Sequence, residues 1–251
     1  LYSSAASDVY KRQAECSVSS RGRTKEEEEV TETLSMSRKK PKNQVPEPVL
    51  RRLPWYLAYI KLLQARGKEV VSSTYIARSI GIDPSLVAKD LSYVNIVGKT
   101  RVGYSTDEMV EVLGKFLGFV DQHKAYVFGC GNLGAALIRD KGLYQYGLDI
   151  VAGFDTSPEV IGDDSLGVPI YDMADLDQRA EDDVRIGVLT VPVEFAQEVT
   201  DQLVASGFKA IWNFTPFRIS VPEDVVVENL SMYASLAVMF NRVSSMSHEE
   251  L

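Results

Sequence analysis

The first part of the chain with a regular hydrophobic pattern consists of helical segments separated by turn residues. Apolar residues recur with helical spacing from Val49 to Gln64, and two shorter helices follow. Ser72 or Ser73 is expected to cap the first of these, and Pro84 opens the second at its first helical position. A basic strand and turn from Gly98 to Tyr104 comes next. This order is typical of a winged helix-turn-helix, although three helices also serve as plain packing modules.

From Ala125 onward the pattern changes to strands that alternate with helices. The predicted strands cover residues 125–128, 149–154, 185–191, 210–214 and 225–228, and helices are expected at 133–140, 194–206 and 231–243. Strands that alternate with helices of this length predict an α/β fold with a parallel, doubly wound Rossmann-type sheet. The last helix carries a long apolar face, which we expect a second copy of the chain to cover.

The chain is therefore expected to have six parts. They are a tail at 1–44, a winged helix at 45–104, a linker helix at 105–124, a Rossmann domain at 125–230, a C-terminal helix at 231–243 and a tail at 244–251. The first tail is rich in Ser, Thr and charge, so we expect it to lack a fold. Within it, residues 8–13 resemble the translation of a transposon adaptor used in preparing sequencing libraries, and the first dozen residues are treated as non-native.

Charge is distributed unevenly between the two domains. Residues 45–104 hold nine Lys or Arg against four Asp or Glu, a net charge of +5, whereas residues 125–243 hold seven against eighteen, a net charge of −11. A basic module joined to an acidic one indicates that only the first meets a polyanion, unless this segregation of surface charge is fortuitous.

Composition favours a cytoplasmic protein. No apolar run is long enough to span a bilayer, and residues 1–7 lack the apolar core of a signal peptide. The two cysteines, Cys16 and Cys130, lie far apart in unlike surroundings, which argues against a disulfide framework. We expect neither a membrane contact nor a metal site.

A glycine-rich loop marks a candidate phosphate site. The segment from Gly129 to Gly134 fits the pattern G-x-G-x-x-G, follows a short apolar strand and opens a helix. Gly129 is expected to allow a tight turn, Gly131 the close approach of a pyrophosphate, and Gly134 the packing of the helix on the sheet. The amino end of that helix would hold the anion with free N–H groups and its dipole.

Together with the glycine loop, Asp155 predicts a dinucleotide site. It ends the second predicted strand, 21 residues after Gly134, where an acidic residue binds ribose hydroxyls and repels a 2′-phosphate. NAD(H) is therefore expected rather than NADP(H). Cys130 is interpreted as a small side chain facing the interior of the sheet, and the alternative is a thiol acidified at the start of the helix.

The predicted Rossmann domain lacks an obvious group for proton transfer. Dehydrogenases commonly need a His, Lys or Tyr beside the hydride acceptor. The two histidines, His123 and His248, lie in the linker and the tail, and Lys141 and Lys209 occupy helix-end or loop positions. We therefore expect a sensor without a catalytic residue.

Several segments in order along the chain resemble the Rex family of redox-sensing transcriptional repressors. The resemblance covers residues 45–243. Its motifs are Arg52-Leu53-Pro54, Ser72-Ser73, Lys89-Asp90-Leu91-Ser92-Tyr93, Gly98-Lys99-Thr100-Arg101-Val102-Gly103-Tyr104, Gly131-Asn132-Leu133-Gly134, Phe154-Asp155, Val191-Pro192, Ala196-Gln197 and Asn213-Phe214-Thr215-Pro216.

The resemblance implies a homodimer that binds palindromic operator DNA, represses fermentative and respiratory genes, and leaves DNA when NADH accumulates. It also implies that the C-terminal helix swaps between subunits. By analogy, the DNA-binding residues are Arg52, Ser72, Ser73, Ser85, Lys89, Lys99, Arg101 and Tyr104. The nucleotide-binding residues are Gly129, Cys130, Gly131, Asn132, Leu133, Gly134, Asp155, Thr190, Val191 and Pro192. Lys89 would enter the major groove, and Tyr104 would support the wing or simply pack in the core, as would Tyr93.

The chain also departs from the family pattern. In that pattern an arginine in the first helix, a tyrosine after the glycine loop and an aspartate before the last helix form a redox-dependent switch. The aligned positions here are Ala58, Asp140 and Ser231, and Ala88 replaces an arginine that often precedes the recognition-helix lysine. The chain is thus expected to be a divergent member whose switch is wired differently.

Three other functions remain open on the sequence alone. The first is a small NAD-dependent oxidoreductase with a helical appendage, which would need a proton relay. The second is a CoA-binding Rossmann protein, which Asp155 disfavours because the CoA ribose carries a 3′-phosphate. The third is an oligomerisation module, which leaves the glycine loop unexplained.

Overall fold

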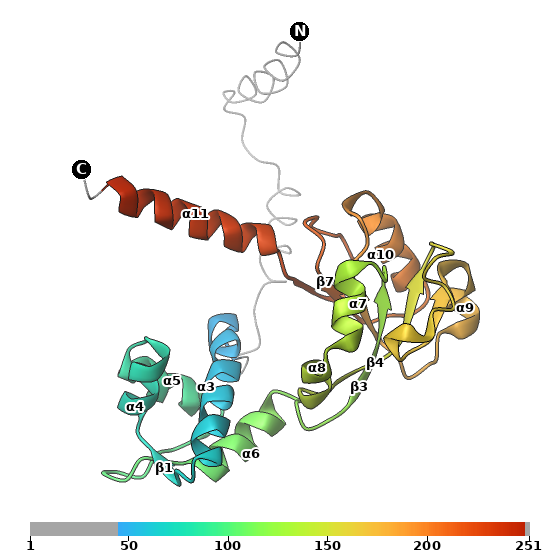
Figure 1. Ribbon diagram of the computed structural model, residues 1–251. Helices are drawn as coiled ribbons and strands as arrows, with labels where there is room; N and C mark the ends of the chain where they lie inside the picture. Colours follow the sequence, from blue (N-terminus) through green and yellow to red (C-terminus); the bar gives the residue numbers. More distant parts are fainter. Residues whose placement is uncertain (1–44, 249–251) are drawn as a thin grey trace, which may run out of the picture. The chain divides into compact units, whose positions relative to one another are not determined.

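The computed structural model describes residues 45–248 (Figure 1). The expectations for the tail at 1–44, and for the last three residues, lie outside this range. No helix within the described range is long and apolar enough to cross a membrane.

Three helices and a small sheet make up the amino-terminal domain, as predicted. The helices are α3 (Glu47–Ala65), α4 (Ser73–Ile80) and α5 (Pro84–Tyr93), and β1 (Val70–Val71) pairs antiparallel with β2 (Tyr104–Ser105). The core face of α3 consists of Val49, Leu53, Tyr56, Leu57, Ile60 and Leu63. Ser72 caps α4 by accepting a hydrogen bond from the amide of Tyr75, which decides between the two serines.

A tight hairpin forms the wing. Lys99 and Gly103 exchange two backbone hydrogen bonds of 2.8 and 2.9 Å, and Arg101 at the tip has a φ of 64°. Gly103 has a φ of 108°, and a Cβ there would lie 2.5 Å from the carbonyl oxygen of Val71. A side chain at this position would therefore push the wing away from β1. Helix α6 (Thr106–Phe116) follows the wing, within the linker where a helix was expected.

Six parallel strands form the sheet of the second domain. They are β3 (His123–Phe128), β4 (Leu148–Asp155), β5 (Ile170–Asp172), β6 (Ile186–Leu189), β7 (Ala210–Asn213) and β8 (Val226–Asn229). Their spatial order is β5-β4-β3-β6-β7-β8, and every neighbouring pair is parallel. The order reverses direction between β3 and β6, which is the point where open α/β sheets bind ligands.

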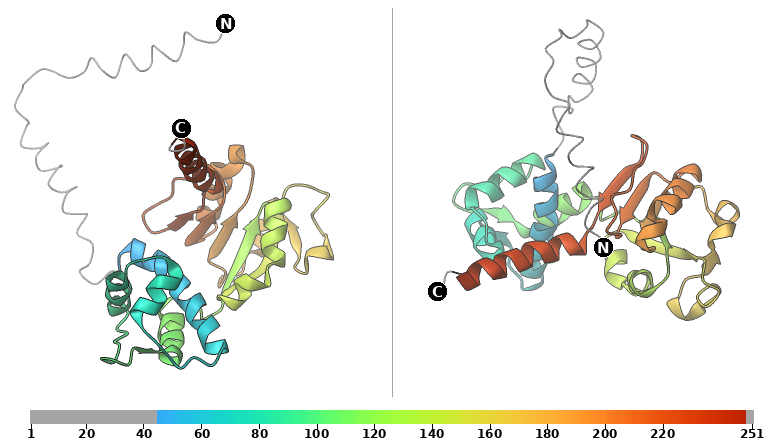
Figure 2. Two further views of the ribbon diagram at one scale, coloured as in Figure 1. Left: turned by 60° about the vertical axis from the view of Figure 1, so that its left-hand side comes forward. Right: turned by 90° about the horizontal axis from the view of Figure 1, so that it is seen from above.

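Helices cover both faces of this sheet. The helices are α7 (Asn132–Arg139), α8 (Lys141–Gln145), α9 (Leu176–Arg179) and α10 (Ala196–Ala205). Along β3, Ala125 and Val127 pack against α7, whereas Tyr126 and Phe128 pack in the aromatic cluster beneath α9 and α10. Figure 2 shows the sheet between green α7 and orange α10. A strand buried on both faces explains why β3 reads as a continuous apolar run.

Several short elements and the end of the last helix differ from the predictions. Strands β1 and β5 and helices α8 and α9 were not predicted, because elements of two to five residues are too short to show a period. The last helix, α11 (Met232–His248), continues past the predicted end at Val243. No Gly or Pro interrupts it, and Ser245 donates a hydrogen bond of 2.9 Å to the carbonyl of Asn241 one turn earlier.

Candidate nucleotide and DNA sites

The three glycines of the loop have different structural requirements. Gly129 has a φ of 90°, and a Cβ there would lie 2.9 Å from the amide nitrogen of Val191. A Cβ on Gly134 would lie 2.1 Å from the carbonyl oxygen of Gly129. A Cβ on Gly131 would have no heavy atom within 4 Å. The fold itself thus requires Gly129 and Gly134, whereas at Gly131 the space is open.

Helix α7 begins directly at this open space. Its N-cap is Gly131, and no side chain caps the helix. Thr190, which follows β6, holds the loop from the other side, because its Oγ1 lies 2.7 Å from the carbonyl oxygen of Gly129. The first turn of α7 can therefore offer backbone N–H groups and the positive end of its dipole to an anion.

The carboxylate of Asp155 is tied to the glycine loop. One oxygen accepts a 2.6 Å hydrogen bond from the amide of Cys130, and the other accepts bonds of 2.8 Å from the amides of Thr156 and Ser157. The sequence predicted the position of Asp155 but not these bonds. They orient the carboxylate at the rim of the cavity, where a ribose diol could share it.

A cavity of about 730 Å³ lies at the carboxyl ends of the strands. It is lined by Phe128, Gly129, Gly131, Phe154, Asp155, Thr156, Ser157, Val160, Met173, Thr190, Val191, Pro192, Phe195, Glu198, Val199 and Gln202. Six of the ten predicted nucleotide residues are among them, and Cys130, Asn132, Leu133 and Gly134 are not. The lining residues that the sequence missed come from the ends of β3 and β4, from the segments after β4 and β5, and from α10 with the turn before it. Only the strand order brings these segments together.

Cys130 has a structural role, and the alternative of an acidified thiol is wrong. Its side chain is buried, and its Sγ lies 3.7 Å from the carbonyl oxygen of Phe154. Burial, together with the charge of Asp155, raises the pKa of the thiol to about 12. The buried side chain confirms the prediction of a small side chain facing the interior of the sheet.

The groups considered for proton transfer lie away from the cavity. His123 begins β3 at the end opposite the glycine loop, and Lys209 precedes β7 and forms an ion pair of 2.6 Å with Asp224. The cavity lining holds no His, Lys or Tyr within residues 45–248. In the same range no group of three or more His, Cys, Asp or Glu could hold a metal ion.

The winged helix presents several of the predicted DNA residues at its surface. Lys89 on α5 and Lys99 and Arg101 on the wing are exposed. Tyr104 is half-buried, and its ring packs over Gly98, where an added Cβ would lie 3.0 Å from the ring carbons. Ser72 caps α4, and the hydroxyl of Ser85 is hydrogen-bonded to Asp83, the N-cap of α5.

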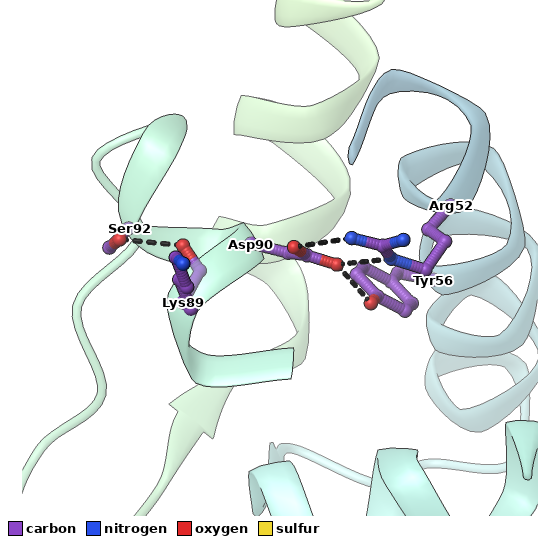
Figure 3. Close-up of polar contacts among 5 residues, drawn as sticks. All are labelled: Arg52, Tyr56, Lys89, Asp90 and Ser92. Atoms are coloured by element: carbon purple, nitrogen blue, oxygen red, sulfur yellow. Dashed lines mark hydrogen bonds and ion pairs between the residues drawn. The ribbon is translucent and has the colours of Figure 1, made fainter. Parts of the chain in front are cut away.

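Arg52 is committed to a neighbouring carboxylate (Figure 3). Its guanidinium forms a bidentate ion pair with Asp90 of α5, at 2.6 and 2.9 Å, and the hydroxyl of Tyr56 donates to the same carboxylate at 2.6 Å. Burial raises the pKa of Tyr56, and the hydrogen bond to Asp90 adds to the shift. The sequence analysis assigned Asp90 no role, because nothing in the local sequence shows that its partner lies on α3.

Comparison with known proteins gives matches to both domains. A family model described as "Putative DNA-binding protein N-terminus" matches residues 44–92, and one described as "CoA binding domain" matches residues 120–217. The redox-sensing transcriptional repressor Rex of Bacteroides thetaiotaomicron is 60% identical over 201 residues, which cover 80% of this chain and 91% of the relative. Rex of Porphyromonas gingivalis is 58% identical over 203 residues, covering 80% of this chain and 93% of the relative. The chain belongs to the Rex family.

Solved Rex structures have the same fold. RSP, a Rex-family repressor, has been crystallised with β-NAD⁺ and operator DNA and, separately, with β-NADH. The first of these structures is 30% identical to this chain, with a TM-score of 0.77 and coverage of 82% of this chain and 96% of RSP. The structure with NADH is 31% identical, with a TM-score of 0.74 and coverage of 82% and 97%. The predicted winged helix and Rossmann sheet are thus confirmed.

The structure gives local roles to two of the three residues that the resemblance aligned with a switch. Ala58 is exposed on α3. Asp140 caps α8 by accepting a 2.7 Å hydrogen bond from the amide of Gly142, and Ser231 accepts a 3.2 Å bond from Ala234 at the start of α11. The two polar replacements therefore stabilise helix ends within this chain.

Proposed function

We propose that this Rex protein is a cytoplasmic repressor that binds NAD(H) at the glycine loop and releases palindromic operator DNA when NADH binds. The observation that carries the proposal is one chain combining an open space at Gly131, beside the carboxylate of Asp155, with exposed cations at Lys89, Lys99 and Arg101. The ligands named for the RSP structures support the same pairing of nucleotide and DNA.

The pyrophosphate would lie against Gly131 and the first turn of α7, and Asp155 would accept hydrogen bonds from the adenosine ribose. The apolar lining from Val160, Met173 and Val199 suits a purine ring. Because the lining, within residues 45–248, holds no His, Lys or Tyr, the nucleotide is proposed to act as a sensed ligand and not as a turned-over cofactor.

CoA is the second candidate ligand, because the model described as "CoA binding domain" matches residues 120–217. Both ligands contain an adenosine and a pyrophosphate, so the glycine loop alone does not separate them. Asp155 does, since a 3′-phosphate on the ribose would meet a carboxylate at the cavity rim. NADH is thus favoured over CoA.

A titration tests the proposed function. The full chain is bound to a fluorescent duplex that it has itself selected from a randomised palindromic library, and NADH, NAD⁺ and CoA are added separately. NADH is expected to release the duplex at a lower concentration than NAD⁺, and CoA to have no effect, because a ligand releases DNA only through its differential affinity for the two states. A complex that ignores NADH would overturn the sensor, and release by CoA alone would favour the second ligand.

A second copy of the chain is proposed to cover α11. The helix exposes an apolar face at Met232, Leu236, Met239, Phe240 and Val243, with Phe240 60% exposed. Truncation after Leu230 is expected to give monomers or aggregates that lose operator binding, because one subunit reaches only one half-site. Sedimentation would show the change in mass, and a stable dimer after truncation would contradict the proposal.

A further inference from the structure

A buried carboxylate lies next to the lysine that is proposed to enter the major groove. The side chain of Asp90 is 1% exposed, although its neighbour Lys89 is exposed. An isolated buried carboxylate is costly, and this one is neutralised by Arg52 and also receives the hydroxyl of Tyr56. Within residues 45–248 no buried side-chain nitrogen or oxygen lacks a hydrogen-bond partner.

The three residues connect α3 to α5 and fix the rotation of α5 about its axis. Arg52 and Tyr56 are four residues apart on α3 and so lie on one face of that helix, and Asp90 reaches them from α5. Figure 3 shows Asp90 directed toward α3, while Lys89 lies on another side of α5. Successive residues on a helix are held at a fixed angle of about 100° to one another. Any rotation of α5 that moves Asp90 therefore turns Lys89 by the same angle.

The chemistry of the contact suits orientation better than stability. Apolar contacts such as those of Val87 and Leu91 hold α5 against the core but tolerate small rotations. A bidentate pair between a planar guanidinium and a carboxylate fixes direction as well as distance. Buried ion pairs add little net stability, and their best-supported use is to set the register of packed elements.

We propose that Arg52 and Asp90 are positioning residues for DNA recognition, and that Arg52 makes no phosphate contact of its own. Their ion pair, supported by Tyr56, sets the rotation of α5 and thereby aims Lys89 at the duplex. This inference rests on the proposed DNA binding. It reassigns Arg52, which the family resemblance placed at the DNA, to a role one step removed from the duplex.

Replacement of Asp90 by Asn separates the two roles by the sign of the effect. The Asn keeps the shape of the side chain but carries no negative charge, so the ion pair with Arg52 is lost. If Arg52 only positions α5, operator affinity falls, because Lys89 loses its fixed direction. If Arg52 contacts phosphate, affinity rises, because the guanidinium is released toward the duplex and one repulsive charge has gone.

A double-mutant cycle gives the second measurement. The full chain, Arg52→Gln, Lys89→Ala and the double variant are titrated with the selected duplex over a range of salt concentrations. Arg52→Gln is expected to weaken binding by at least about threefold in the parent, and by less than twofold when Lys89 is already Ala. The salt slope in the Lys89→Ala background should not change on adding Arg52→Gln.

Two variants serve as controls. Arg66→Gln removes an exposed charge just past the end of α3, so it reports the general effect of losing one cation, and this effect should be the same in both backgrounds. Tyr56→Phe removes one hydrogen bond from Asp90 and keeps the buried ring, so it tests the same positioning if Arg52→Gln does not fold. It should weaken binding in the parent and not in Lys89→Ala.

Each outcome decides something. Equal effects of Arg52→Gln in both backgrounds, with the salt slope reduced by about 0.9 each time, would show a direct phosphate contact and overturn the positioning role. Tighter binding by Asp90→Asn would do the same. If the unaltered chain selects no duplex, the proposed function fails, and the positioning role fails with it.

Discussion

The nucleotide loop and the wing are both tight turns that depend on a glycine packed against a neighbouring stretch of backbone. Gly129 lies against the backbone at Val191, and Gly103 lies against the carbonyl of Val71. Each turn is proposed to bind a phosphate-containing ligand, but with different chemical groups. The loop offers backbone N–H groups at the start of α7, whereas the wing offers the side chains of Lys99 and Arg101.

This difference explains how a single chain could bind a dinucleotide and DNA at two different sites. Residues 125–243 carry a net charge of −11, which repels a long polyanion, yet local amide dipoles still hold a small pyrophosphate. Residues 45–104 carry +5 and attract DNA over a longer range. Backbone recognition suits a ligand enclosed in a cavity, and side-chain charge suits one that lies along a surface.

The largest effect is expected from a side chain on the loop itself. Gly134→Val should prevent the loop from closing, because the first added carbon already lies 2.1 Å from the carbonyl of Gly129. Overpacking of this kind costs about 1–3 kcal/mol or more of stability. Calorimetry should show a lowered melting temperature, and NADH fluorescence should show no binding.

The matched variant Gly131→Val should keep the fold and still lose the nucleotide. The space around Gly131 is open, so the melting temperature without nucleotide should stay near that of the parent, whereas the pyrophosphate would meet the branched side chain. Operator binding without NADH should be unchanged. Equal destabilisation by the two valines would contradict the distinction between the two glycines.

A smaller loss is expected for Asp155→Ala. Removing a charge-assisted hydrogen bond to ribose costs about 1.5–3 kcal/mol, or roughly ten- to a hundredfold in NADH affinity. The amides of Cys130, Thr156 and Ser157 also lose their acceptor, so Asp155→Asn is the control that retains one acceptor oxygen. More NADH should be needed for release of DNA, and an unshifted release curve would show that the ribose lies elsewhere.

Lys99→Ala should weaken operator binding by an amount that depends on salt. Loss of one phosphate contact lowers the slope of log affinity against log salt by about one. Arg101→Ala should in addition alter a preference for A·T-rich sequence if the wing tip enters a narrow minor groove. NADH affinity should not change in either variant. Unaltered DNA affinity at moderate salt in both would remove the wing from the interface.

The smallest effect concerns Cys130. Its pKa is raised from 9.0 to about 12, so the folded thiol stays protonated while the unfolded thiol ionises. The stability that this group contributes is complete below about pH 9 and is lost as pH rises toward 12, by roughly 1 kcal/mol at pH 10. Chemical denaturation at pH 8 and pH 10, with Cys130→Ala as control in a Cys16→Ser background, should reveal the difference. A thiol that is alkylated rapidly in the folded protein at pH 8 would contradict the burial.

Sequence by itself determined the two domains, most of their elements and the positions of the loop glycines and Asp155. Hydrophobic period and turn residues are local signals, and the glycine pattern carries its geometry in its spacing. Tertiary structure alone decided which segments line the cavity, because β4, β5 and α10 meet only through the strand order. It also decided that Asp90 is buried against Arg52, since the burial of a charge depends on a partner 38 residues away along the chain.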